Sequence, residues 1–110
     1  MMSHFERHWN SVAKKVYKNA VKHGFWDEEP NDAERIALMH AELSEALEAL
    51  RDGNPSSNKI MRYSSLEEEL ADVVIRIMDY AFGNDLDVSG AIIAKIEYNK
   101  SREYMHGKSF

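Results

Sequence analysis

Acidic residues recur at a regular spacing in the segment HAELSEALEAL, residues 40–50. Glu42 and Glu45 are three residues apart, among alanines and leucines that favour a helix. A second pair with the same spacing, Glu69 and Asp72, occurs in the next helical pattern. Residues three apart lie one turn apart on the same face of a helix. Such a pair is either part of a solvated surface or one half of a metal site.

The two acidic pairs are expected to lie at the same height in an antiparallel helical hairpin. The first pair lies nine and six residues before the expected helix end at Arg51. The second lies four and seven residues after the expected helix start at Ser65. With a rise of about 1.5 Å per residue, these positions differ by no more than about one turn. If the two faces point toward each other, four carboxylates converge.

Convergence of four carboxylates requires compensation. Two unit charges about 5 Å apart repel by roughly 3 kcal/mol at an effective dielectric constant of about 20. Several such pairs would rival the net stability of a small domain, so protons or cations must offset them. The chain has no cysteine, and an all-oxygen donor set favours hard cations, Mg²⁺ first and then Mn²⁺. The pattern therefore predicts a metal site, with a solvated acidic surface as the alternative.

The elements that must position these carboxylates are helices. Apolar residues recur at helical spacing in four segments, and the chain shows little sign of strands. The expected helices span about residues 3–24, 32–51, 65–82 and 88–103. This pattern predicts an all-α antiparallel four-helix bundle, formed by a single domain of residues 1–110. The connection at residues 52–64 is long for a helical hairpin, and loops of that length are often functional.

Capping patterns and apolar stripes refine this expectation. Three helix starts pair a capping residue with a glutamate three residues later: Ser3 with Glu6, Asn31 with Glu34, and Ser65 with Glu68. The main apolar stripe of the second helix is expected to face the core: Ile36, Met39, Leu43, Leu47 and Leu50. The third helix is apolar over more than half its circumference, more than a surface helix of a small monomer needs. We therefore expect a homo-oligomer. Arg76 and Asp79 share the narrow polar strip of this helix, where they either tune the acidic site or pair with each other.

The expected fourth helix carries basic and amide side chains on one stripe. Lys95, Asn99 and Arg102 follow at intervals of four and three residues, beside apolar residues that should face the core. Cations near a metal–carboxylate cluster suit a polyphosphate, because the metal neutralises part of its charge and Lys and Arg take the rest. The alternative is that these are cations favoured by the dipole at a helix C-terminus.

The chain resembles the MazG-like nucleoside triphosphate pyrophosphohydrolases of the all-α NTP pyrophosphatase superfamily. Three blocks carry the resemblance, in order along the last two-thirds of the chain: LMHAELSEALEALR, EEELADVVIRIMDYA and KIEYNKSREYMHGKSF. The family motif, E-x-x-E followed after a variable spacer by E-x-x-D, falls on Glu42, Glu45, Glu69 and Asp72. A later Lys, Asn and Arg pattern matches Lys95, Asn99 and Arg102. The first helix and the loop FWDEEP, which help shape the base pocket, match only loosely.

The resemblance implies Mg²⁺-dependent hydrolysis of a nucleoside triphosphate between its α and β phosphates, releasing the monophosphate and pyrophosphate. It implies that the four carboxylates hold one or more Mg²⁺ ions and that one of them takes a proton from the attacking water. Lys95 and Arg102 would bind the leaving pyrophosphate, with Asn99 as a polar anchor. Homodimers or homotetramers and a role in removing noncanonical or surplus nucleotides are also implied. We expect Trp26, in the FWDEEP loop, to stack on the base; a core or interface aromatic is the alternative.

Composition excludes several other classes. A formal net charge of −5 argues against binding of a nucleic acid polymer, which needs a basic face. No apolar run is long enough to cross a bilayer, and charges stand where a signal peptide needs an apolar segment. We therefore expect a soluble cytoplasmic protein. Two rivals to the enzyme remain: a catalytically silent helical dimerisation or regulatory module of the same fold, and a bundle that binds a metal for structural reasons.

Overall fold

The computed structural model describes residues 1–29 and 31–109, and within them the chain is all-helical, without a strand. The helices are α1 (His4–Lys22), α2 (Asp32–Arg51), α3 (Ser65–Gly83) and α4 (Val88–Lys100), with a short 3₁₀ turn at Tyr104–Gly107. The all-α prediction is confirmed, although the last helix ends before Glu103. Pro30, which closes the FWDEEP loop, lies outside the described residues. Nowhere in the described ranges is a helix both long and apolar enough to cross a membrane.

Side-chain caps fix the starts of the helices. The capping box expected at the start of α1 and the Asn31 cap of α2 are both present. The cap of α3 was predicted one residue too late. The hydroxyl of Ser64 accepts the amide N–H of Glu67 at 3.1 Å, and the Glu67 carboxylate accepts the N–H of Ser64 at 2.9 Å. The predicted pair was Ser65 with Glu68, so Glu68 is left for another contact.

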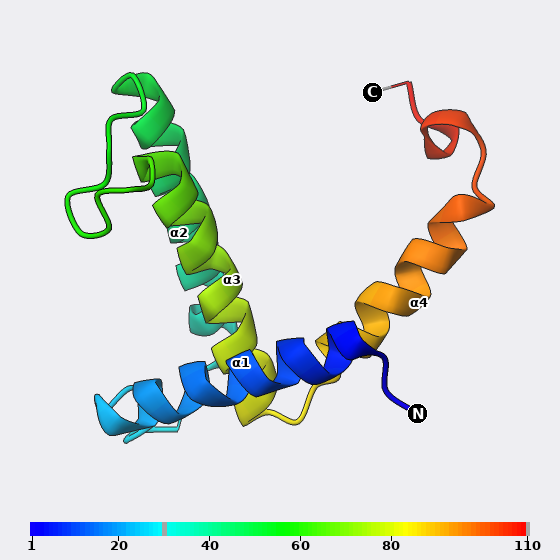
Figure 1. Cartoon of the computed structure of the whole chain (residues 1–110), viewed down its shortest axis with the longest axis horizontal. Helices are drawn as coiled ribbons and strands as arrows, with labels where there is room; N and C mark the ends of the chain where they lie inside the picture. Colours follow the sequence, from blue (N-terminus) through cyan, green and yellow to red (C-terminus); the bar gives the residue numbers. More distant parts are fainter. Residues whose placement is uncertain (30, 110) are drawn as a thin grey trace.

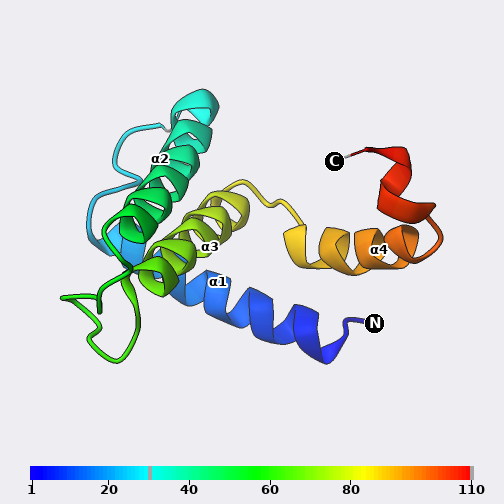
Figure 2. The same cartoon turned by 90° about the horizontal axis from the view of Figure 1, so that it is seen from above.

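Three helices pack together, and the fourth extends away from them. α2 and α3 lie side by side as an antiparallel hairpin, and α1 crosses α3 near its C-terminal end (Figures 1 and 2). α4 packs chiefly against α1 and projects away from the α2–α3 hairpin in both views. The prediction of an antiparallel four-helix bundle required α4 to pack beside α2 and α3. Within the described part of a single chain, α4 does not do so.

The core of the single chain is small and built mainly from alanine. Its buried hydrophobic residues, within the described part, are Ala13, Ala46, Ala49, Met78 and Ala81. The leucines of α2 that were expected in the core are about half exposed: Leu43 46%, Leu47 50% and Leu50 53%. The prediction for this stripe was wrong for the single chain, because α2 turns its alanines toward the interior. The small side chains allow the helix backbones to approach closely.

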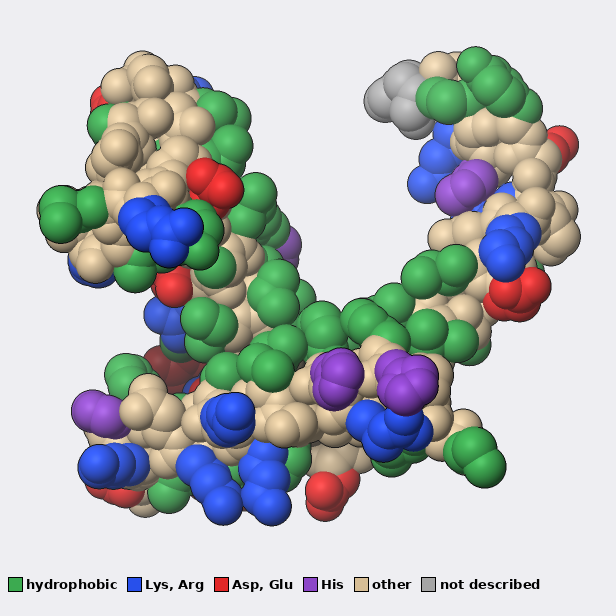
Figure 3. Space-filling model, in the orientation of Figure 1, with side chains coloured by type: hydrophobic (Ala, Val, Ile, Leu, Met, Phe, Trp, Pro, Cys, Tyr) green, Lys and Arg blue, Asp and Glu red, His purple; other side chains and the backbone are tan. Residues whose placement is uncertain are grey.

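The surface of the chain is larger than a compact monomer would have. The accessible area is 8562 Å², whereas a folded monomer of this mass exposes about 6,200 Å². The radius of gyration is 16.4 Å, compared with about 13 Å for a compact domain of this length. Hydrophobic side chains line the side of α3 that faces α4 and continue onto α4 (Figure 3). The chain therefore leaves uncovered a large apolar surface of the kind that proteins bury against a partner.

Candidate metal centre and adjoining groove

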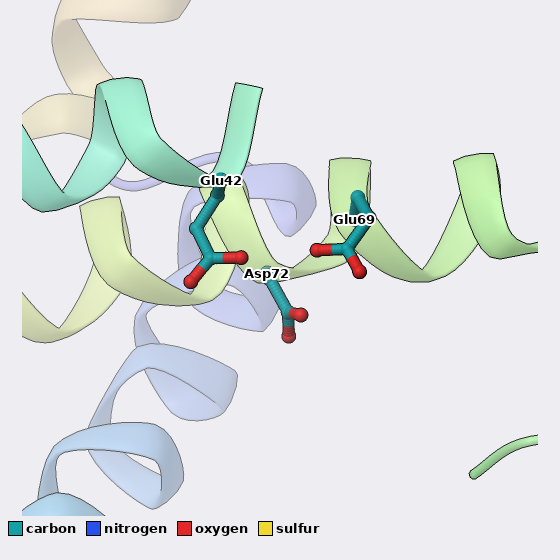
Figure 4. A group of neighbouring side chains, drawn as sticks. All are labelled: Glu42, Glu69 and Asp72. Carbon is teal, nitrogen blue, oxygen red and sulfur yellow. The ribbon is translucent and has the colours of Figure 1, made fainter. Parts of the chain in front are cut away.

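The two acidic pairs of α2 and α3 meet in one place. One carboxylate oxygen from each of Glu42, Glu69 and Asp72 lies within 4.8 Å of the others. Glu42 projects from α2 toward the two residues of α3 (Figure 4). Glu45 is exposed at the edge of this group and shares hydrogen bonds with Glu42 and Glu69. We call these four residues the acidic cluster. The antiparallel hairpin brings them together because their heights on the two helices match.

The electrostatics of the acidic cluster show the strain of bringing these charges together. Burial, hydrogen bonds with Glu45 and Glu42, and the charges of Glu45 and Asp72 raise the pKa of Glu69 to about 7. Burial also opposes ionisation of Glu42. Hydrogen bonds from Arg76 and with its carboxyl neighbours outweigh that effect and lower the pKa of Glu42. The cluster therefore holds both a carboxylate and a carboxyl that keeps its proton until near neutral pH.

The donor set fits a hard divalent cation. All the available ligand atoms are carboxylate oxygens, which is the chemistry that Mg²⁺ prefers. One of them, Oε2 of Glu69, is buried, and no N–H or hydroxyl group of the described residues donates to it. A buried acceptor without a partner is costly in a folded protein, and a cation would satisfy it. Glu42, Glu69 and Asp72 are the residues that could hold the ion, with Glu45 at the edge.

Two cations of the same chain act on the acidic cluster. The guanidinium Nε of Arg76 donates to Oε1 of Glu42 at 2.9 Å. Burial and the charges of Glu42 and Glu68 raise the pKa of Asp72, while the charges of Lys59 and Arg76 oppose that rise. Neither Lys59 nor Arg76 was among the substrate-binding residues expected from the sequence.

Arg76 and Asp79 do not form the mutual pair that was one of the two predictions for them. Arg76 pairs with Glu42, whereas the buried carboxylate of Asp79 pairs with Arg35 at 3.4 Å. Asp79 also accepts a hydrogen bond from Nε1 of Trp26 at 2.8 Å. The other prediction for these residues, a role in tuning the acidic site, agrees with the contact that Arg76 makes to Glu42.

The ring of Trp26 is packed among protein groups rather than open for stacking. The Arg35 guanidinium lies over the ring, 4.3 Å from its centre, and the ring of Tyr17 meets it edge-on with centres 5.2 Å apart. A Cβ placed on Gly83 would overlap the Trp26 ring, so glycine is required there by the close approach of the indole. These contacts favour the core alternative for Trp26, which anchors its loop to α3.

The neighbouring residue, Phe25, faces an open groove beside the acidic cluster. The groove has a volume of about 540 Å³ and is lined by α1, by α2 and α3, and by Phe25. Glu42 and Asp72 lie on its wall, as does Asn19 of α1. The side chain of Phe25 is 63% exposed. Its backbone is fixed, because its N–H donates to the carbonyl of Ala20 and its own carbonyl accepts from Arg35. Phe25 was not among the site residues predicted from the sequence, although it adjoins Trp26 in the same loop.

The basic stripe of α4 stands apart from the acidic cluster within one chain. Lys95 and Arg102 flank the ring of Tyr98, at 4.6 and 5.5 Å from its centre. Asn99 is half-buried, and its Oδ1 is buried with no hydrogen-bond partner in residues 1–29 and 31–109. Because α4 projects away from α2 and α3 (Figure 1), the structure does not bring these three residues to the carboxylates of the same chain.

Protonation of Glu69 predicts a pH dependence of stability. Its pKa of about 7 exceeds the usual value of 4.5, so the folded metal-free protein holds a proton that the unfolded chain releases. This contribution to stability is fully present below about pH 4.5 and is lost as pH rises through about 7. The Tm of the metal-free protein should therefore fall more steeply between about pH 5 and about pH 8 in the wild type than in Glu69→Gln. Thermal melts in a chelator test this, and equal slopes would contradict it.

Comparison of the chain with protein-family models, with curated proteins and with solved structures gave no significant match.

Proposed function

We propose that the protein is a Mg²⁺-dependent nucleoside triphosphate pyrophosphohydrolase of the MazG-like type, which cleaves between the α and β phosphates. The observation that carries this proposal is the acidic cluster, where three carboxylates converge within 4.8 Å beside a groove of about 540 Å³. Pockets of this size hold small molecules, and a nucleoside is among them. The resemblance of the helical blocks to this family supports the same assignment.

Each part of the proposed site has a role in the reaction. Bound Mg²⁺, or Mn²⁺ in its place, would neutralise phosphate charge and polarise the α-phosphorus. Glu42, Glu69 and Asp72 would hold the ion, and Glu45 orients the cluster through its hydrogen bonds to two of them. Arg76 lines the same groove as Glu42 and Asp72, and its hydrogen bond to Glu42 favours the ionised carboxylate. Val16, Ala20 and Ile75 give the groove an apolar portion against which the base would lie.

The nucleoside is assigned to the groove, with its base against Phe25. Stacking of a base on an aromatic ring contributes about 1–3 kcal/mol. Phe25→Ala should therefore raise KM for nucleoside triphosphates by about tenfold or more, with little effect on inhibition by pyrophosphate, which lacks a base. Steady-state kinetics measure both quantities. Phe5→Ala is the control, because Phe5 is also exposed but packs near Trp9 on α1. If Phe25→Ala and Phe5→Ala changed KM to the same extent, Phe25 would not be a base-binding residue.

A homo-oligomer accounts for the uncovered apolar surface. The chain exposes about 2,300 Å² more than a compact monomer of its mass, so two copies expose about 4,600 Å² more. Obligate interfaces commonly bury about 2,000–5,000 Å² in total over both partners, a range that includes this value. A second copy seated against α2, α3 and α4 would cover leucines of α2 and isoleucines of α4. It would also provide a second α4, so that Lys95, Asn99 and Arg102 of one copy could serve the carboxylates of the other. A dimer is the smallest assembly that meets both needs, and a tetramer of such dimers meets them too.

A substrate panel tests the proposed function. Canonical and modified ribo- and deoxyribonucleoside triphosphates would be incubated with the protein and Mg²⁺, and pyrophosphate and phosphate measured separately. The proposal expects pyrophosphate and nucleoside monophosphate in equal amounts, and no reaction in a chelator. Release of phosphate, or no reaction with any triphosphate, would contradict it. A preference for triphosphates with modified bases would support a biological role in removing noncanonical nucleotides from the cytoplasmic nucleotide pool.

The alternative is a catalytically silent helical dimerisation or regulatory module. A silent module has no need to bring carboxylate oxygens of Glu42, Glu69 and Asp72 within 4.8 Å of one another. The presence of this costly feature favours the enzyme. If the metal served structure alone, chelation would unfold the protein rather than only stop the reaction.

A further inference from the structure

The loop between α2 and α3 is folded around one buried hydroxyl. Ser57 is 2% exposed, and its Oγ donates to Oε1 of Glu68 at 2.5 Å. The same oxygen accepts the backbone N–H groups of Lys59 and Ile60, each at 3.1 Å. The Ser57 N–H also donates to the carbonyl of Tyr63 at 2.9 Å. These bonds fix the course of the loop beside the first turns of α3, where Figure 1 shows it projecting.

The folded loop brings Lys59 to the acidic cluster. Its Nζ lies 3.7 Å from Oε2 of Glu68, and the Lys59 side chain is 78% exposed while that of Glu68 is 13% exposed. Glu68 adjoins Glu69 in the chain and lies about one helical turn before Asp72 on α3, so the ammonium group stands beside the α3 half of the acidic cluster. The ammonium group therefore lies at the solvent side of the carboxylates.

Lys59 is free to change partners without harm to the loop. The ion pair is long, at 3.7 Å, and its lysine is mostly exposed to solvent, so the contact contributes little to stability. Glu68 keeps the hydrogen bond from Ser57 when the ammonium leaves, so no buried carboxylate loses all its partners. Arg76, the other nearby cation, is held at 2.9 Å by Glu42 and is more buried. A lysine is a compact charge on a flexible stem and suits a phosphate whose position changes during a reaction.

We propose that Lys59 is a substrate-binding residue. Its ammonium group would move away from Glu68 and bind the terminal phosphates of the triphosphate, and then the pyrophosphate released from it. This inference rests on the proposed function, since it takes the acidic cluster as the place where the α-phosphate lies. It adds a phosphate ligand from the α2–α3 loop, which the family pattern treats only as a spacer. Phosphate binding by Lys59 would explain why this loop is long and why it is folded around the buried side chain of Ser57.

Binding of pyrophosphate in the presence of Mg²⁺ tests the proposal without requiring turnover. Hydrogen bonds to charged groups are worth about 1.5–3 kcal/mol, so Lys59→Ala should weaken Mg²⁺–pyrophosphate binding by roughly 10-fold to 100-fold in calorimetry. Lys59→Arg should restore most of the affinity. Binding of nucleoside monophosphate should change less than about twofold. Arg62→Ala is the matched control, because Arg62 is a cation of the same loop for which no ion pair is found among the described residues.

The outcomes separate this proposal from the proposed function. Equal losses for pyrophosphate and monophosphate, no loss in Lys59→Ala, or no binding of Mg²⁺–pyrophosphate to the wild type would overturn the role of Lys59. Normal pyrophosphate binding with no hydrolysis of any triphosphate would instead overturn the enzymatic assignment and leave Lys59 as a pyrophosphate ligand.

Ser57 serves as a positioning residue for Lys59, and a double substitution tests this. Ser57→Ala should weaken pyrophosphate binding less than Lys59→Ala does, and should have no further effect when Lys59 is already alanine. Additive losses in the double variant would show that Ser57 acts on binding by another route. Thermal melts of each variant check that the loop contact is lost without global unfolding.

Discussion

Glu45→Gln should abolish Mg²⁺-dependent pyrophosphate release and leave the metal-free protein at least as stable as the wild type. The carboxylate of Glu45 hydrogen-bonds with Glu42 and Glu69, and its charge is one of the causes that raise the pKa of Glu69. Glutamine keeps the size of the side chain but removes that charge. The loss of one charged group from a metal-dependent site is expected to cost about 3 kcal/mol of transition-state stabilisation, which is a rate loss of about 100-fold or more.

Stability distinguishes a functional Glu45 from a structural one. Removing a like charge from the acidic cluster relieves repulsion, so the free energy of unfolding in a chelator should be unchanged or higher. Glu48→Gln is the control, since Glu48 lies one turn further along α2 and, among the residues that the structure describes, pairs only with the exposed Arg51, at 2.8 Å. Its activity and stability should match the wild type. A fall of several kcal/mol in the metal-free stability of Glu45→Gln would make Glu45 a structural residue and would sink the proposed metal site.

The acidic cluster could be predicted from the sequence because it depends only on local geometry. A spacing of three places each pair on one helix face, and a hairpin of two helices then sets their relative height. No long-range packing has to be known for that argument. Lys59 and Phe25 could not be found in the same way, because each reaches the site from a loop. Their positions depend on the Ser57 turn and on the Trp26–Asp79 contact, which have no periodic signal.

The apolar stripe of α2 shows why the packing was harder to predict than the helices. Hydrophobic periodicity identifies the face that must be covered, and Leu43, Leu47 and Leu50 form such a face. Periodicity does not say which surface covers it. In the single chain the interior of α2 is made by Ala46 and Ala49, and the leucines stay about half exposed. The same uncertainty affected α4, whose basic stripe was expected beside the carboxylates of its own chain.

A mixture of two inactive variants should recover activity if α4 completes the site of a second copy. Arg102→Ala removes a cation of α4, and Glu45→Gln damages the acidic cluster of α2, so each variant alone should be nearly inactive. In a mixed dimer, one site then receives both defects and the other receives neither. Random pairing of the two chains would give about a quarter of the wild-type activity, because half the dimers are mixed and half their sites are intact.

Co-expression of the two variants with different tags, followed by purification through both tags, isolates the mixed assembly for the pyrophosphate assay. It should show about half the wild-type activity per dimer, since one of its two sites is intact. The cis arrangement predicts none, because each site of the mixed dimer would then carry one defect. A single species at the monomer mass in light scattering would contradict the shared site altogether. A shared site would explain why the same helix carries both uncovered isoleucines and a buried amide oxygen without a partner, at Asn99. Neither feature has a complement within the described part of a single chain, and a second copy that covered the isoleucines would also lie close enough to satisfy the amide.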